Sequence, residues 1–147
     1  EIHFHLTMSL THYQEFIHQL EPFINFQNAV NGTNYYLVIR HRNSIETWNS
    51  SGITFSSNSA VYDFTSSQST AYGNNLKLKG SKYCIFSGDV NQDGTIDASD
   101  LSQVENDAAN SVGGYVTNDL NGDNFVDASD VSIVDNNSAN SVMAITP

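Results

Sequence analysis

Two twelve-residue stretches near the carboxyl end of the chain carry oxygen-bearing side chains at matching positions. The first runs from Asp89 to Asp100 and the second from Asp119 to Asp130. In each, Asp or Asn stands at positions 1, 3, 5, 9 and 12. A hard cation of calcium's size takes about six to eight oxygens at about 2.3–2.6 Å, and a chain curled around it offers alternate side chains. The spacing therefore predicts two calcium ions, one for each stretch.

The full predicted ligand set follows the positions of an EF-type calcium loop, in which position 7 contributes its main-chain carbonyl. Position 6 requires a positive φ, which Gly94 adopts freely and which Asn124 tolerates better than most side chains. We expect the apolar position 8 of each loop to attach it to a core. The predicted ligands are Asp89, Asn91, Asp93, Thr95, Asp97, Asp100, Asp119, Asn121, Asp123, Phe125, Asp127 and Asp130.

The two loops belong to an internal repeat, which also contains the elements that must position them. Residues 88–112 align with residues 118–142, with 14 identities in 25 positions. After each loop, small or apolar residues recur at i, i+3 and i+7, a spacing typical of a helix. We therefore predict a loop and an exiting helix, twice. The helical positions are Leu101, Val104 and Ala108, and then Val131, Val134 and Ser138.

The charge of the chain is confined to this repeat. The net charge is −11, with 16 acidic and five basic residues among 147. Residues 1–87 contain five of each, whereas residues 88–147 contain the other eleven acids and no Lys or Arg. Such a segment repels itself unless cations neutralise it. This charge excludes nucleic acids and anionic membrane surfaces as partners. The sequence contains no run of about 18 apolar residues, so it predicts no insertion into a membrane.

On these residues the carboxyl-terminal part resembles the type I dockerin, a tandem calcium-binding repeat. The pattern Asp-x-Asn-x-Asp-Gly-x-(Ile/Val)-Asp-x-x-Asp matches Asp89 to Asp100 at every defined position, and the second loop departs from it only at Asn124. The resemblance covers about residues 88–142. It implies one calcium ion per repeat, folding that depends on the ion, and helices packed antiparallel about a pseudo-twofold axis.

The resemblance also implies a partner and the residues that contact it. Dockerins bind cohesins through positions 10 and 11 of each loop. These positions hold small and weakly polar residues in this chain, unlike the hydroxyl pair often found there. The implied contacts with a cohesin-like protein are Ala98, Ser99, Ala128 and Ser129.

Residues 1–87 predict a different architecture, an antiparallel β-sandwich. Residues 2–10 alternate apolar and polar side chains, as a half-buried strand does. In residues 11–22 the spacing of Tyr13, Phe16, Ile17 and Leu20 fits a helix, while their neighbours favour a strand or an irregular connection before Pro22. Residues 31–48 resemble a small β-sandwich module that precedes dockerin-like repeats in secreted bacterial surface proteins. Short apolar or aromatic runs between turn signals predict further strands at 23–26, 34–40, 45–48, 52–55, 60–64 and 83–86.

The fold class is therefore mainly β with a small α part. It comprises a β-sandwich module at residues 1–87, in which residues 1–10 form a candidate donor strand, and a dockerin-like double repeat at 88–147.

No catalytic constellation emerges, so we expect no enzyme. The absence of an initiator Met at Glu1 favours a mature, secreted product. Three sites match the glycosylation acceptor pattern of a glycoprotein, namely Asn31, Asn49 and Asn136.

Two functions remain open from the sequence. The first is a secreted, calcium-binding structural subunit of an extracellular filament or surface assembly, in which residues 2–10 complete the sheet of a neighbouring copy. The second is an anchoring module, whose repeat docks onto a cohesin-like receptor while the sandwich acts as a spacer. The first reading makes the partner another copy of the chain, and the second makes it a cohesin-like protein.

Overall fold

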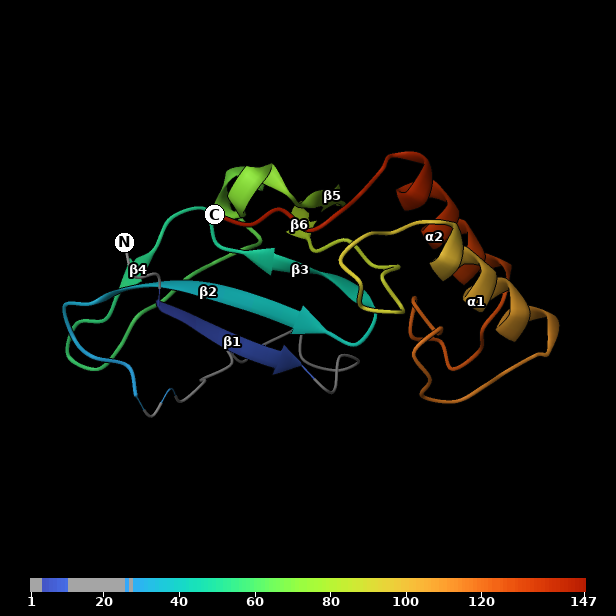
Figure 1. Cartoon of the computed structure of the whole chain (residues 1–147), viewed down its shortest axis with the longest axis horizontal. Helices are drawn as coiled ribbons and strands as arrows, with labels where there is room; N and C mark the ends of the chain where they lie inside the picture. Colours follow the sequence, from blue (N-terminus) through green and yellow to red (C-terminus); the bar gives the residue numbers. More distant parts are fainter. Residues whose placement is uncertain (1–3, 11–25, 27) are drawn as a thin grey trace.

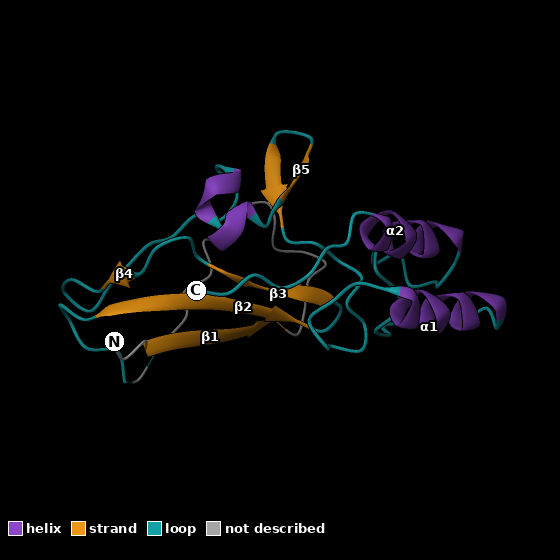
Figure 2. Ribbon diagram, turned by 45° about the horizontal axis from the view of Figure 1, so that its top comes forward, coloured by secondary structure: helices purple, strands orange, loops and turns teal. Residues whose placement is uncertain are grey.

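The computed structural model describes residues 4–10, 26 and 28–147 (Figure 1). The predicted connection at 11–22 lies outside these residues, as does the run at 23–26 apart from Phe26. Strands gather at one end of the molecule and the α-helices at the other (Figures 1 and 2). No helix in the described part of the chain is long and apolar enough to cross a membrane.

A four-stranded sheet occupies the amino-terminal part. Its order is β1 (Phe4–Leu10), β2 (Asn34–His41) and β3 (Ser44–Trp48), and the short β4 (Ile53–Thr54) also pairs with β2. Strands β2 and β3 are antiparallel and joined by a tight turn. Strand β1 runs parallel to β2, with Phe4 opposite Tyr35 and Leu10 opposite His41. The predicted amino-terminal strand therefore pairs with a strand of its own chain.

The sandwich prediction is not confirmed, and the expected antiparallel pairing is wrong for β1. The described residues form one mixed sheet and a separate hairpin of β5 (Lys77–Lys79) and β6 (Lys82–Cys84). Alternation of apolar residues fixes which face of a strand is buried and leaves its direction open. Parallel strands require a crossover of about a dozen residues or more, and residues 11–33 provide that length.

Most of the other predicted strands are present, while one is wrong. The runs at 34–40 and 45–48 correspond to β2 and β3, and those at 52–55 and 83–86 overlap β4 and β6. Residues 60–64 form no strand. There the Tyr62 hydroxyl donates to the carbonyl of Thr70 and its ring packs on Phe64, with ring centroids 4.8 Å apart. These side-chain contacts take the place of the main-chain hydrogen bonds between strands that an aromatic run of this kind predicts.

Both predicted helices are confirmed. Helix α1 (Ala98–Ala109) and helix α2 (Ala128–Ala139) have the same length and the same amino-terminal cap. Asp97 and Asp127 cap them, each within a capping box completed by an Asp three residues later, which satisfies two main-chain N–H groups at each helix start. Two short 3-10 helices, η1 (Gln68–Thr70) and η2 (Tyr72–Asn74), were not predicted.

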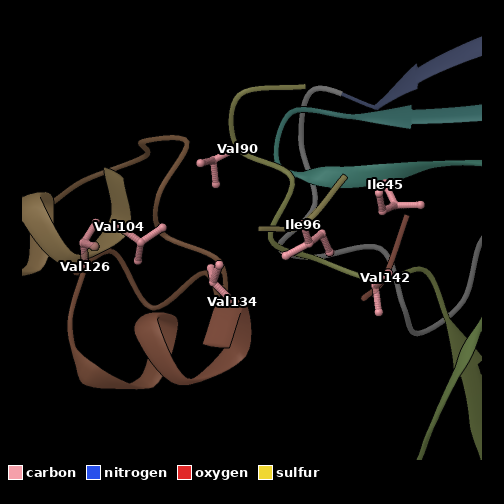
Figure 3. Close-up of a cluster of buried hydrophobic side chains, with 7 residues drawn as sticks. All are labelled: Ile45, Val90, Ile96, Val104, Val126, Val134 and Val142. Atoms are coloured by element: carbon pink, nitrogen blue, oxygen red, sulfur yellow. The ribbon is translucent and has the colours of Figure 1, made fainter. Parts of the chain in front are cut away.

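One buried apolar cluster joins the sheet to the repeat. Figure 3 shows Ile45, from β3, on one side of this cluster, with valines of the loops and helices on the other. The predicted units at 1–87 and 88–147 therefore pack against each other over a shared core. Its buried members are Ile45, Val90, Ile96, Val104, Val126, Val134 and Val142.

The segment after α2 returns from the helices toward the sheet (Figure 1). The N–H of Ile96 donates to the Val142 carbonyl at 2.9 Å, and the N–H of Ala144 donates to the Gly94 carbonyl at 2.8 Å. Ile145 then forms a parallel bridge with Thr47 of β3. Residues 142–145, which we call the carboxyl-terminal segment, thus link the first loop to the sheet.

Candidate metal centre

The first loop surrounds two buried carboxylates. Asp89 is 2% exposed and Asp100 is fully buried. The oxygens of Asp89 accept from the N–H groups of Asp93 (3.1 Å) and Gly94 (3.2 Å), across the loop. Those of Asp100 accept from Val90 (2.9 Å) and Asn91 (3.2 Å) through Oδ1, and from Asp97 (3.0 Å) through Oδ2. These bonds fold the loop back on itself between its first and last positions.

The second loop repeats this network almost bond for bond. Asp119 accepts from Asp123 at 3.1 Å and from Asn124 at 3.1 Å. Asp130 accepts from Leu120 at 2.7 Å, from Asn121 at 3.0 Å and from Asp127 at 3.0 Å. Corresponding distances in the two loops are nearly equal. The equivalence predicted from the internal repeat therefore extends to the hydrogen bonds.

Positions 6 and 8 behave as the loop chemistry requires. Gly94 has φ +90° and Asn124 has φ +71°, so both lie in the left-handed region. The apolar position 8 is buried in both loops, as Ile96 and as Val126. Each of these two residues donates its N–H to a valine carbonyl, that of Val142 or of Val112, at 2.9 Å. Each loop is thus attached to the segment that follows one helix.

The carboxylates at position 9 are engaged at the helix starts. Asp97 and Asp127 are exposed, and Oδ1 of each accepts from the N–H of a Ser two residues later at 2.7 Å. The main-chain and side-chain hydrogen bonds from Ser99 lower the pKa of Asp97. The side-chain bond from Ser129, followed by its main-chain bond, lowers the pKa of Asp127. Both caps are therefore charged at neutral pH.

The electrostatics of the first loop favour a cation. Burial raises the pKa of Asp89 to about 6, and the negative charges of Asp100 and Asp93 add to this effect, while the N–H groups of Gly94 and Asp93 oppose it. No Lys or Arg occurs in residues 88–147 to offset this repulsion. A divalent cation among the carboxylates would offset it.

The available donors are of mixed type. No group of three or more His, Cys, Asp or Glu side chains that could hold a metal ion gathers among residues 4–10, 26 and 28–147. Each loop instead combines buried carboxylates at positions 1 and 12 with an exposed Asn and Asp at positions 3 and 5 and a main-chain carbonyl at position 7. These donors are all oxygens, so they fit a hard cation such as calcium better than a transition metal.

The sheet presents different groups to the two loops. A cavity of about 320 Å³ adjoins the first loop and is lined by Glu46 and Arg40 of the sheet together with Asp89 and Asp93. At the second loop, the Arg42 guanidinium lies 3.9 Å from the centre of the Tyr115 ring and donates to the Asp119 carbonyl at 3.4 Å. Sequence reasoning missed these sheet residues because no local spacing indicates a contact between positions so far apart in the chain.

The four predicted partner-contact residues are all exposed. Ala98 and Ser99 lie in the first turn of α1, and Ala128 and Ser129 in the first turn of α2. Each serine hydroxyl also accepts from the Asn at loop position 3, at 2.8 Å in the first repeat and 2.7 Å in the second. Ser99 and Ser129 are therefore bonded directly to side chains of the loops.

The glycosylation prediction is wrong for Asn49. Its side chain is fully buried, accepts from the N–H of Leu37 at 2.9 Å and donates to the Ser51 carbonyl at 2.6 Å. A sugar cannot reach an amide that is enclosed and bonded on both sides. Asn31 and Asn136 are exposed, so these two predictions stay open.

Comparison with known proteins identifies one part of the chain. Residues 87–139 match the family model of the dockerin type I domain. The search of curated proteins found no match, and neither did the search of solved structures. The match spans both loops and both helices, so it coincides with the candidate metal centre. Type I dockerins bind calcium, in agreement with the oxygen donors described above.

Proposed function

From the dockerin-like domain at residues 87–139, we propose that this chain is a non-catalytic anchoring module that acts outside the cell and binds a cohesin-like receptor in a calcium-dependent manner. The observation that carries the proposal is the pair of equivalent loops, each ending at an exposed helix start. A calcium shell filled by protein oxygens leaves no open position for substrate, which supports a role without catalysis.

Two ions, one per loop, complete the proposal. The first would be held by carboxylates of Asp89, Asp93, Asp97 and Asp100 with the oxygens of Asn91 and of the Thr95 carbonyl, and the second by the corresponding residues of the second loop. When bound, calcium supplies positive charge that lets buried carboxylates remain ionised. The protein's own contribution is the hydrogen-bond network that holds the loop ends together.

The receptor-binding surface follows from the geometry of the helix starts. Ser99 and Ser129 are exposed, and each accepts a hydrogen bond from an Asn of its loop. A loop that closes around its ion therefore sets the orientation of the serine beside it. The small Ala98 and Ala128 leave the helix backbone accessible to a close-fitting partner.

The filament reading has less support. A filament built by strand exchange requires an amino-terminal strand that completes the sheet of a neighbouring copy. Strand β1 instead pairs along its whole length with β2 of the same chain. This pairing favours the anchoring function over the filament subunit.

The test is capture by a panel of purified type I cohesin modules, with calcium or with chelator. We expect binding by at least one module with calcium and none with chelator. Ala98→Arg combined with Ala128→Arg should abolish capture, while Val61→Arg, at a residue that is 81% exposed in the sheet-bearing part, should leave it unchanged. Capture that persists in the double variant would refute the assigned surface.

Light scattering of the free chain tests the filament reading, which requires oligomers that disappear when residues 1–10 are removed.

A further inference from the structure

One residue outside the repeat contacts the start of both loops. Asn43 lies in the turn between β2 and β3 and is 2% exposed. Its main-chain carbonyl accepts from the N–H of Gly88 at 2.7 Å and from the Ser87 hydroxyl at 3.3 Å. Its side-chain Nδ2 donates to the carbonyls of Thr117 at 2.8 Å and Asp119 at 3.3 Å. Ser87 and Gly88 directly precede the first loop. Thr117 lies two residues before the second loop, and Asp119 is its first residue.

The two sets of partners lie at the entrance of each loop. Ser87 and Thr117 stand at corresponding positions of the two copies, while Gly88 directly precedes the first loop and Asp119 is the first residue of the second. Asn43 therefore contacts the entrance of both loops, with its main chain on one side and its side chain on the other. This link between the two units comes from the sheet and lies outside the internal symmetry of the repeat.

The chemistry of the carboxamide suits this place. Its NH₂ group has two N–H donors, and its nitrogen lies within hydrogen-bond distance of two main-chain carbonyls. Aspartate at this position would offer no donor to those carbonyls and would add charge beside two acidic loops. Neighbours reinforce the attachment, since Arg42 donates to the Asp119 carbonyl and Gln92, in the first loop, donates to the Ser44 carbonyl at 3.4 Å.

We propose that Asn43 is a positioning residue that couples the two ion loops, so that a cation bound in one raises the affinity of the other. The inference rests on the proposed calcium binding. The main chain at the entrance of each loop must be held in place before the first carboxylate, that of Asp89 or Asp119, can face the ion. Because Asn43 bonds to both entrances, at Gly88 and at Asp119, the ion that binds first orders the turn for both loops. The second ion then meets a smaller ordering cost, which is positive coupling.

The coupling is measured with chains in which one loop is disabled. Asp123→Ala disables the second loop and Asp93→Ala the first, and both residues are exposed. Calcium titration by calorimetry gives the affinity of each remaining loop. We expect the affinity of the first loop to fall about fivefold or more when the second is disabled, within the range usual for coupled sites. In an Asn43→Ala background we expect disabling either loop to leave the affinity of the other unchanged.

The matched control is Asn49→Ala. Asn49 is also buried, and its Nδ2 donates to the Ser51 carbonyl at 2.6 Å, so this variant loses a comparable bond away from both loops. Both variants should lower the unfolding midpoint, but only Asn43→Ala should remove the coupling. If Asn43→Ala does not fold, Asn43→Ser, which keeps one donor, serves instead and should reduce the coupling.

Each outcome separates this inference from the proposed function. Saturable uptake with the same coupling in parent, Asn43→Ala and Asn43→Ser chains would overturn the role of Asn43. Independent loops in the parent chain would overturn it as well. No calcium uptake by any chain would overturn the proposed function itself. Hydrogen exchange at Gly88 gives a second readout, because one ion bound in the second loop should slow it in the parent and not in Asn43→Ala.

Discussion

Truncation of Ile45 to Ala tests whether the sheet and the repeat unfold together. Ile45 comes from β3, is fully buried and belongs to the same cluster as valines of both loops and both helices. The change removes three carbon atoms, worth about 2.4 kcal/mol at about 0.8 kcal/mol each. The cavity left behind adds to this, so we expect a loss of about 3–4 kcal/mol. With a urea slope of about 2 kcal/mol per molar, the unfolding midpoint should fall by about 1.5–2 M.

The assay is urea unfolding in saturating calcium, followed by two probes in the same samples. Fluorescence of Trp48, the only tryptophan, reports the sheet, and far-ultraviolet circular dichroism reports α1 and α2. We expect the two transitions to coincide in the parent and to shift together in Ile45→Ala. Val61→Ala, at an exposed residue, should move neither by more than about 0.5 kcal/mol. A shift of the fluorescence transition alone would refute the shared core and restore two independent domains.

Three further results are expected. Gly94→Ala should weaken calcium binding and lower the free energy of unfolding by about 1–2 kcal/mol, because Ala must adopt φ near +90°. Asn124→Gly should leave stability unchanged or raise it slightly. Equal effects of the two variants in calcium calorimetry and in thermal unfolding would contradict this expectation. Burial, and then the charge of Arg42, lowers the pKa of His41, so the unfolded chain takes up a proton at this residue before the folded chain does. The contribution of neutral His41 to stability is therefore complete above about pH 6.5 and is lost as the pH falls below that value. His41→Gln should therefore flatten the decline in melting temperature between pH 7 and pH 5, and parallel curves for parent and variant would exclude this cause. Chelation should accelerate hydrogen exchange in residues 88–142 before the sheet, and exchange unaffected by chelator would contradict an ion-dependent repeat.

The loops and helices could be predicted because their determinants are local. The loop oxygens, the left-handed positions Gly94 and Asn124 and the apolar position 8 all act within one loop, and each helix begins at an Asp that caps it. The repeat then provided a second copy of the same evidence. For these elements, short-range physical chemistry and the final structure agree.

The sheet was harder to predict because its arrangement depends on distant contacts. Alternation in residues 4–10 predicted a strand and could not give its direction, which the long connection to β2 permits to be parallel. The acceptor pattern at Asn49 gave no sign that the amide would be buried against Leu37. Likewise, nothing adjacent to Asn43 in the sequence indicates that it reaches Thr117 and Asp119.

The carboxyl-terminal segment gives the molecule a second mechanical connection. A pull between a receptor on the helix starts and the sheet would be resisted by more than the covalent chain between Cys84 and Ala98. Part of the load would pass through the main-chain hydrogen bonds that join Ile96 to Val142 and Ala144 to Gly94, and on to β3. The first loop lies within that path, so an ion that stiffens it would also raise the force at which the two ends of the molecule separate.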